Sequence, residues 1–113
     1  MFRVSCIQLC SSDNVEYNLK KTKQLILKAI KQRANFILTP EVSSKISLDK
    51  KKLLKTATSM EKDSYLHGIK SLAKKYKKWI LIGSLILKIS KNKLVNRSIL
   101  ISPKGKIKCY YDK

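Results

Sequence analysis

The feature that most restricts the fold of this chain is the run of apolar residues at positions 79–85. The run is far shorter than the roughly 18–20 residues that a membrane-spanning helix needs, and its length suits a strand. A strand that is apolar throughout is typical of a sheet with both faces covered. The run therefore predicts a layered α/β fold with this strand inside a sheet.

Strand-like and helix-like segments alternate along the rest of the chain. The predicted strands are residues 3–10, 34–39, 79–85, 94–102 and 107–111, with a hairpin turn at 103–106. The predicted helices are residues 14–33 and 60–78, and residues 42–58 are expected to form a loop with a short helix. This order predicts a mixed sheet with helices packed on it. Two long helices leave one face of five strands poorly covered.

Both predicted helices carry one apolar face. The first is expected to begin with a capping box, in which the side chains of Asp13 and Glu16 each satisfy an unpaired backbone N–H. The residues expected to face the core are Val15, Leu19, Thr22, Ile26, Ala29, Ile30, Tyr65, Ile69, Leu72 and Tyr76.

The formal net charge of +19 has two explanations. A basic surface can bind nucleic acid by neutralising phosphates and releasing counterions. Alternatively, lysine simply fills solvent-exposed positions. The lysines are spread along the chain, and arginine, which makes bidentate contacts to guanine and phosphate, occurs only at Arg3, Arg33 and Arg97. These observations favour a solvated surface and argue against nucleic acid as a partner, with a small basic nucleic-acid-binding protein kept as the alternative.

Three cysteines without a recognisable spacing indicate neither a disulfide framework nor a metal site. The N-terminal residues lack the charged start and long apolar stretch of a signal peptide. We therefore expect a cytoplasmic protein that uses no cofactor or metal and contacts no membrane. Cys6 and Cys10 are expected to be small buried residues of the first strand and Cys109 to lie within the last strand, so none is a good candidate nucleophile.

Two charged residues follow predicted strands at a wide separation. Glu41 comes directly after Pro40, which lacks an N–H and ends the strand at 34–39. Lys113 follows the last predicted strand. Charged residues at such positions are mostly solvated, so these two gain a functional meaning only from a wider pattern.

That wider pattern resembles the nitrilase, or carbon–nitrogen hydrolase, superfamily. Its members typically begin with a strand, a short turn and an Asn-Leu pair on the first helix, as at Asn18 and Leu19. Residues 34–41 are similar to the strand that delivers a catalytic glutamate directly after proline. Residues 79–85 resemble the family's glycine-containing third strand, and residues 95–113 resemble the run that leads to its catalytic lysine. The likeness is strongest to amidases acting on ω-amides or deaminated glutathione.

The resemblance implies a fold and a reaction. Residues 1–113 correspond to the N-terminal part of an α-β-β-α sandwich, as an incomplete carbon–nitrogen hydrolase domain. Glu41 would be the general base of a Glu-Lys-Cys triad, Lys113 would stabilise the oxyanion, and the nucleophilic cysteine would lie beyond Lys113. The implied reaction is hydrolysis of a non-peptide C–N bond of a small linear amide through a thioester, by an enzyme that is a homodimer when full length.

Without a nucleophilic thiol, residues 1–113 alone are expected to be inactive. Besides the nucleic-acid-binding protein, a truncated, non-catalytic relic remains an alternative. The chain departs from the family at two helix ends, where Arg33 and Lys77 replace the glycine that takes a positive φ without strain. Each replacement is expected to cost about 1 kcal/mol.

Overall fold

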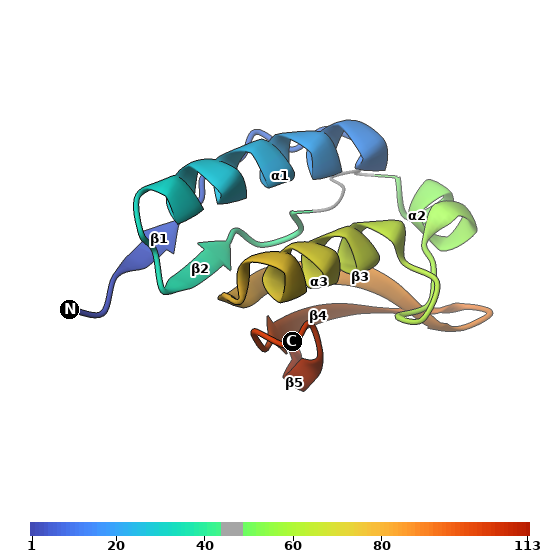
Figure 1. The fold of residues 1–113 in the computed structure, drawn as a ribbon. Helices are drawn as coiled ribbons and strands as arrows, with labels where there is room; N and C mark the ends of the chain where they lie inside the picture. The colour runs from blue at the N-terminus through green and yellow to red at the C-terminus, as the bar shows by residue number, and fades with distance from the viewer. Residues whose placement is uncertain (44–48) are drawn as a thin grey trace.

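The computed structural model describes residues 1–43 and 49–113. The elements in chain order are β1 (Val4–Cys6), α1 (Val15–Lys31), β2 (Phe36–Thr39), α2 (Lys50–Thr56), α3 (Ser64–Tyr76), β3 (Trp79–Ser90), β4 (Lys93–Ile101) and β5 (Ile107–Asp112) (Figure 1). The predicted order is confirmed. The short helix expected within residues 42–58 is α2, and residues 44–48 of that segment lie outside the described residues. Within the described ranges, no helix has both the length and the apolar character needed to cross a membrane.

The strands form one mixed sheet in the order β1-β2-β3-β4-β5. β1, β2 and β3 are parallel, because helical connections return the chain to the same edge after β1 and after β2. The pairs β3–β4 and β4–β5 are antiparallel, with short connections between the strands. β5 therefore runs in the same direction as β2, although two strands separate them.

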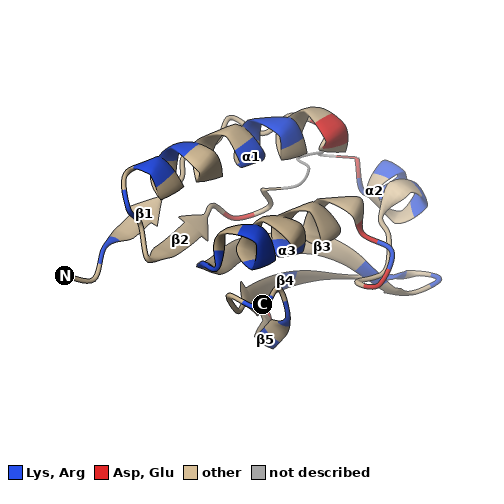
Figure 2. Cartoon of the chain, in the orientation of Figure 1, with Lys and Arg blue, Asp and Glu red and all other residues tan. Residues whose placement is uncertain are grey.

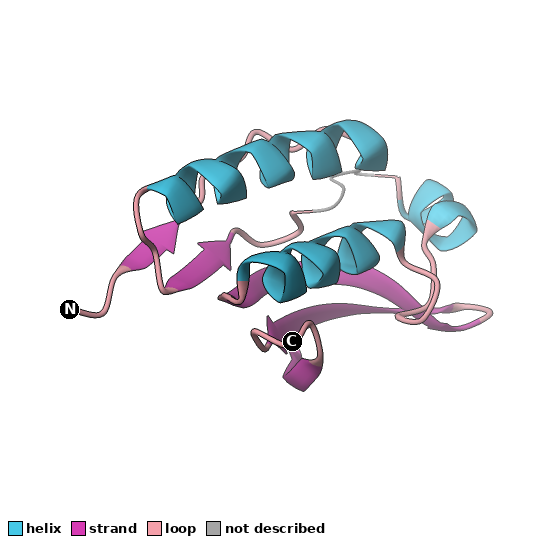
Figure 3. Ribbon diagram, viewed as in Figure 1, coloured by secondary structure: helices cyan, strands magenta, loops and turns pink. Residues whose placement is uncertain are grey.

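Helices α1 and α3 contact each other and lie on one face of the sheet (Figure 3). Ile37, Ile80 and Ile101 are paired across β2, β3 and β4, and all three are fully buried beneath the helices. The residues predicted to face the core are confirmed as buried or half-buried. The buried ones are Thr22, Ile26, Ala29, Tyr65 and Ile69, and the half-buried ones are Val15, Leu19, Ile30, Leu72 and Tyr76.

The opposite face of the sheet carries no helix of the described part of the chain. Leu38, Leu81 and Leu100 are paired in one row on this face and remain only half-buried. Tyr111 is 70% exposed. The expected cover of residues 79–85 on both faces is therefore not provided by the described residues, because both long helices pack from one side and burial along β3 alternates. The predicted poor cover of one face is confirmed.

The cysteines are more exposed than expected. Cys6 and Cys109 pair with Leu38 and Leu100 on the open face of the sheet, where nothing described covers them. Cys10 lies beyond the end of β1 and is also exposed. The expected burial of Cys6 and Cys10 is wrong, whereas the position of Cys109 within the last strand is confirmed.

The first helix is capped by a different residue from the one predicted. The side chain of Asn14 accepts a hydrogen bond from the backbone N–H of Tyr17 at 2.9 Å, which makes Asn14 the N-cap. Asp13 precedes the cap and forms an ion pair with Lys52 at 3.1 Å. The capping box predicted at Asp13 and Glu16 is therefore wrong.

Both long helices end at a residue with positive φ. The φ angle is 64° at Arg33, just after α1, and 55° at Lys77, the C-cap of α3. Glycine adopts this conformation freely, whereas a residue with a Cβ pays about 1–2 kcal/mol. The backbone thus takes the same turn that glycine favours, at a cost in stability.

Gly68 lies where α3 packs against α1. A Cβ built at Gly68 would be 2.9 Å from the Cδ1 atom of Leu19 and 3.2 Å from the Cε atom of Lys23. Glycine inside a helix costs about 1 kcal/mol relative to alanine. At this position the missing side chain allows the two helices to touch.

Replacing Asn14 by alanine is expected to lower the free energy of unfolding by about 1 kcal/mol, because the N–H of Tyr17 loses its acceptor. Asn14→Ser retains a capping oxygen and is expected to stay within about 0.3 kcal/mol of the parent. Urea unfolding followed by circular dichroism measures both changes. Equal losses in the two variants would contradict the assignment of Asn14 as the cap.

Candidate active site

Glu41 and Lys113 both lie beyond the C-terminal ends of their strands, on the same side of the sheet, although they are far apart in sequence. β2 and β5 run in the same direction, so their C-terminal ends point to one edge. The pairing register places Thr39 of β2 and Tyr110 of β5 in the same row across the sheet. The edge at the carboxyl ends of the strands is where open α/β sheets bind their ligands.

The side chains of Glu41 and Lys113 form an ion pair. The Nζ atom of Lys113 donates a hydrogen bond to Oε1 of Glu41 at 2.5 Å. The side chains are 34% exposed for Lys113 and 70% exposed for Glu41. Ion pairs this open to water add only about 0–1 kcal/mol to stability. A carboxylate beside an ammonium can accept a proton and stabilise a nearby anion.

The segment that leads from β2 to Glu41 lies directly against Gly83 in β3. A Cβ built at Gly83 would be 2.4 Å from the carbonyl O of Thr39 and 2.6 Å from the carbonyl C of Pro40. Both are backbone atoms, which cannot rotate aside as the end of a side chain can. The N–H of Gly83 also donates to Oγ1 of Thr39 at 3.3 Å. Glycine is therefore required for the chain to reach Glu41 along this path.

Ser84 holds the turn that follows Glu41. Its Oγ accepts a hydrogen bond from the N–H of Val42 at 2.8 Å, and its carbonyl O accepts one from the N–H of Ser43 at 3.2 Å. Val42 has a φ of 47°, a conformation that β-branched residues rarely adopt. Such strain costs on the order of 1–3 kcal/mol and persists only where the surroundings impose it. The two bonds to Ser84 supply that constraint.

A cluster of buried hydroxyl groups supports this turn from the helix side. Tyr65, Thr22 and Ser43 are completely buried. The phenol oxygen of Tyr65 lies 2.8 Å from Oγ1 of Thr22 and also hydrogen-bonds with the side chain of Ser43. Burial raises the pKa of Tyr65 above its ordinary value, so the phenol stays neutral at physiological pH. The cluster ties the turn after Glu41 to α1 and α3.

Lys113 is held through its backbone and its neighbour. Its N–H donates to the carbonyl O of Asn96 in β4 at 2.9 Å. The preceding residue, Asp112, accepts hydrogen bonds from Nε and Nη2 of Arg97 at 2.6 and 2.9 Å. These bonds hold the pKa of Asp112 below its ordinary value, and Asp112 in turn raises the pKa of Arg97. Within the described residues, the buried Oδ1 of Asn96 has no hydrogen-bond partner.

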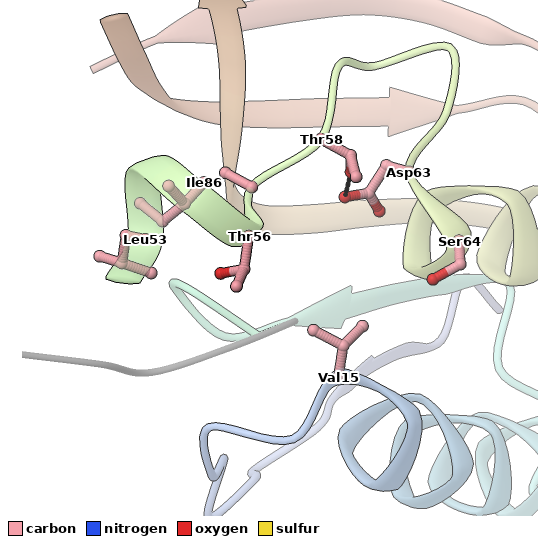
Figure 4. Close-up of a pocket in the computed structure, with 8 residues that line it drawn as sticks. Val15, Leu53, Thr56, Thr58, Asp63, Ser64 and Ile86 are labelled. Carbon is pink, nitrogen blue, oxygen red and sulfur yellow. Dashed lines mark hydrogen bonds between the residues drawn. The ribbon is translucent and has the colours of Figure 1, made fainter. Parts of the chain in front are cut away.

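A cavity of about 120 Å³ lies between the N-terminal ends of α1 and α3, the end of α2, and β3 (Figure 4). The carboxylate in it is already engaged: Asp63 caps α3 by accepting from the N–H of Leu66 at 2.8 Å, and it accepts from Oγ1 of Thr58 at 3.0 Å. Neither Glu41 nor Lys113 lines this cavity. We therefore assign it to the packing of the helix ends and not to the Glu41–Lys113 site.

No thiol or metal-binding cluster accompanies the ion pair in the part of the chain that the structure describes. Cys6, Cys10 and Cys109 are free thiols, and none makes a hydrogen bond to Glu41 or Lys113. Across residues 1–43 and 49–113, no three His, Cys, Asp or Glu side chains are grouped so that they could hold a metal ion.

The supporting residues Gly83, Ser84 and Arg97 were not singled out from the sequence as parts of the site. A glycine inside an apolar strand is a signal for a bulge or a close backbone approach, and the β3–β4 register does shift between Ile82 and Leu85. Gly83 could therefore have been found. Ser84 and Arg97 carry no comparable signal, because their roles depend on the register of neighbouring strands.

Replacing Gly83 by alanine is expected to lower the free energy of unfolding by about 2 kcal/mol, because the new Cβ meets immobile backbone. Gly68→Ala is the matched control. Its Cβ meets only the mobile ends of Leu19 and Lys23, and the helix gains about 1 kcal/mol from alanine. Urea unfolding of both variants tests this order. A Gly68→Ala loss as large as that of Gly83→Ala would refute the argument.

The Arg97–Asp112 pair is expected to make stability depend on acid pH. The pKa of Asp112 is 3.8 without a partner and lower in the folded protein. The pair therefore contributes stability that is present above pH 3.8 and is lost as the pH falls through the folded-state pKa. The difference in free energy of unfolding between the parent and Asp112→Asn should shrink as the pH falls, and urea unfolding at a series of pH values measures it. A difference that stays constant with pH would contradict it.

Known proteins match this chain in sequence and in fold. Two curated relatives are deaminated glutathione amidases, one from Yersinia enterocolitica and one from Dictyostelium discoideum. The first is 28% identical over 119 residues and the second is 28% identical over 117 residues. The alignments cover 97% and 98% of this chain but only 38% and 40% of the relatives. The chain thus spans about two fifths of the length of these relatives.

Solved structures share the fold. The Caenorhabditis elegans NitFhit protein matches with a TM-score of 0.88 and 24% identity, over 100% of this chain and 29% of that one. An N-terminal amidase bound to a Gln-Gly peptide matches with a TM-score of 0.85 and 23% identity, over 99% of this chain and 27% of that one. An amidase from Nesterenkonia sp. AN1, seen with acrylamide added to its active-site cysteine, matches with a TM-score of 0.83 and 16% identity, over 100% of this chain and 44% of that one.

The family assignment rests on the sequence itself. The model of the carbon-nitrogen hydrolase family matches residues 3–113, which is nearly the whole chain. The matched range includes both Glu41 and Lys113. This chain belongs to the carbon–nitrogen hydrolase family.

Proposed function

We propose that residues 1–113 form the N-terminal part of an amidase domain in which Glu41 is the general base and Lys113 stabilises the oxyanion. The observation that carries the proposal is the contact between Nζ of Lys113 and Oε1 of Glu41 at 2.5 Å. The fold brings these two side chains together across two intervening strands. The contact itself adds little stability, and support for a chemical role comes from the match of the carbon-nitrogen hydrolase family model over residues 3–113, which include both side chains.

The proposed reaction needs a cysteine thiol from the remainder of the domain. Glu41 takes the thiol proton, and the thiolate attacks the amide carbon. The carbonyl electron pair moves to oxygen, where the ammonium of Lys113 stabilises the negative charge. When the intermediate collapses, the C–N bond breaks and Glu41 gives its proton to the leaving amine. A water molecule deprotonated by Glu41 then attacks the thioester, and release of the acid returns the thiol.

The remainder of the domain would also remove water from the site. The Glu41 and Lys113 side chains are partly exposed, and in water their charges act only weakly on a substrate. The open sheet face is lined by half-buried leucines such as Leu38 and Leu81. In our proposal the second sheet of an α-β-β-α sandwich covers this face. Excluding water then strengthens the effect of both charges on the reacting atoms.

The substrate class proposed is a small linear amide. Both curated relatives described above are deaminated glutathione amidases, and the N-terminal amidase is seen with a Gln-Gly peptide. Deaminated glutathione and the Gln-Gly peptide each contain an acyl group joined to nitrogen, and this C–N bond is the one that the Glu-Lys-Cys chemistry opens. We propose deaminated glutathione as the first substrate to test and a homodimer as the state of the complete enzyme.

The high positive charge needs no separate function in this proposal. Lysine and arginine lie on α1, α2, α3 and the hairpin between β3 and β4, and they do not form one stripe (Figure 2). Such a distribution fits a solvated surface, whereas nucleic-acid binders concentrate the charge along one face. Neither a contact among residues 1–43 and 49–113 nor a motif of the sequence specifically favours the nucleic-acid alternative.

The test is to express the whole reading frame that contains residues 1–113 and to measure hydrolysis of deaminated glutathione by mass spectrometry of the products. Glu41→Gln is expected to lower kcat about 100-fold to 10,000-fold, because the general base is lost. Lys113→Met is expected to lower kcat about 100-fold to 1,000-fold through loss of oxyanion stabilisation.

The matched controls are Glu16→Gln and Lys108→Gln, which remove the same charges at exposed positions on α1 and β5. They are expected to keep the parental kcat. The proposal would be overturned if the protein expressed from the complete reading frame hydrolyses no amide or stays fully active after Glu41→Gln. The non-catalytic relic would then be the hypothesis to pursue.

A further inference from the structure

The charged residue Arg97 of β4 is buried against the helix-covered face of the sheet. It is only 9% exposed. Arginine is rarely buried unless a partner compensates its charge. Its Nε and Nη2 atoms both donate to the carboxylate of Asp112, at 2.6 and 2.9 Å. This is the two-point geometry in which guanidinium and carboxylate bind most strongly and with a defined orientation.

Two further contacts fix the guanidinium of Arg97. Its Cζ atom lies 4.0 Å from the centre of the Tyr110 ring, and its Nη1 atom lies 3.5 Å from the sulfur of Met60. Arg97 therefore connects β4 to Asp112 and Tyr110 of β5 and to the segment before α3. A guanidinium held on three sides has little freedom to move, and neither has the carboxylate that it binds.

The residue pair next to Arg97 and Asp112 is Asn96 and Lys113. Asp112 directly precedes Lys113, and Asn96 directly precedes Arg97. The N–H of Lys113 donates to the carbonyl O of Asn96 at 2.9 Å, so the Arg97–Asp112 pair and the Asn96–Lys113 bond are consecutive cross-links between β4 and β5. Any shift of Asp112 is passed to Lys113 through one peptide unit.

Packing alone does not hold this end of β5. β5 is an edge strand, and five of its six residues are exposed. A lysine ammonium sits at the end of a flexible four-carbon chain, so the position of Cα sets the range of places that the ammonium can reach. Catalytic groups must be held within about 0.5 Å of their productive position to be effective. The end of β5 therefore needs a fixing contact, and Arg97 supplies one.

We propose that the Arg97–Asp112 pair is a positioning device for Lys113, which sets the distance between its ammonium and Glu41. Arg97 is a positioning residue in this role and does not touch the substrate. The inference rests on the proposed function, since it concerns the oxyanion-stabilising lysine. It adds two residues to the site whose only route to the chemistry is through Lys113.

The first test measures catalysis in the complete reading frame with Arg97→Lys, Arg97→Gln and Asp112→Asn. Arg97→Gln and Asp112→Asn are expected to lower kcat about 10-fold to 100-fold, the size of effect that a small misplacement of a catalytic group produces. KM should change much less. Arg97→Lys keeps the charge but loses the two-point contact and should fall between Arg97→Gln and the parent. Lys52→Gln breaks the exposed Lys52–Asp13 pair and should keep the parental kcat.

The second test does not depend on activity. The Cε and Nζ resonances of Lys113 are assigned in isotope-labelled protein by comparison with Lys113→Arg. In Arg97→Gln they are expected to move toward the values of a freely solvated lysine, whereas Lys52→Gln should leave them unchanged. Unchanged Lys113 resonances in Arg97→Gln would overturn the positioning role.

The two tests separate the proposals. Loss of thermal stability in Arg97→Gln with kcat and the Lys113 resonances retained would show that the pair is merely structural. A parent protein that hydrolyses no amide would refute the proposed function. In that case the response of the Lys113 resonances still decides whether Arg97 and Asp112 position this lysine.

Discussion

The position of Glu41 depends on one steric constraint, the contact between the backbone of Thr39 and Pro40 and the Cα of Gly83. β2 ends two residues before Glu41, and the chain must leave the sheet without moving away from β3. The absence of a Cβ at Gly83 allows this, since a Cβ would lie 2.4 Å from the nearest backbone atom. Once the chain is this close, Ser84 can bond to both N–H groups that follow Glu41. The strained backbone at Val42 follows from that path.

The one-sided cover of the sheet has a second set of consequences. With α1 and α3 on one face, the alternate residues of β2, β3 and β4 divide into a fully buried row of isoleucines and a half-buried row of leucines. Apolar surface of this kind is costly to leave in water, at about 25 cal/mol per Å². The open face and the partly exposed Glu41–Lys113 pair are therefore both in contact with solvent in the described part of the chain. Further protein packed here would bury the apolar row and change the solvation of the two charges.

Much of the fold could be predicted from the sequence, because helix and strand periodicities are local signals. The order of elements, the mixed sheet and the core faces of both helices were predicted in this way and are confirmed. The capping error was local, whereas the errors on burial arose where the outcome depends on contacts distant in sequence. Asp13 and Asn14 are equally good caps by residue type, and the local backbone conformation selects Asn14. The burial of Cys6 was wrongly predicted, and the described residues do not supply the two-sided cover expected of residues 79–85, because a single strand does not reveal how many layers surround it.

For the site, the sequence could suggest Glu41 and Lys113 only through their matched context, and it could not reveal what holds them. The contacts that hold Glu41 differ in kind from those that hold Lys113. Glu41 is supported by Gly83, Ser84 and a cluster of buried hydroxyls, all of them neutral groups, and burial raises the pKa of the Tyr65 phenol further above its ordinary value. Lys113 is supported by an ion pair whose carboxylate is protonated at sufficiently low pH. Protonation of Asp112 in acid would therefore weaken one of the contacts that support Lys113. The two sets of contacts differ because β2 lies inside the sheet, where buried neutral groups surround its end, whereas β5 is an edge strand whose end is held by backbone pairing with β4 and by the Arg97–Asp112 ion pair.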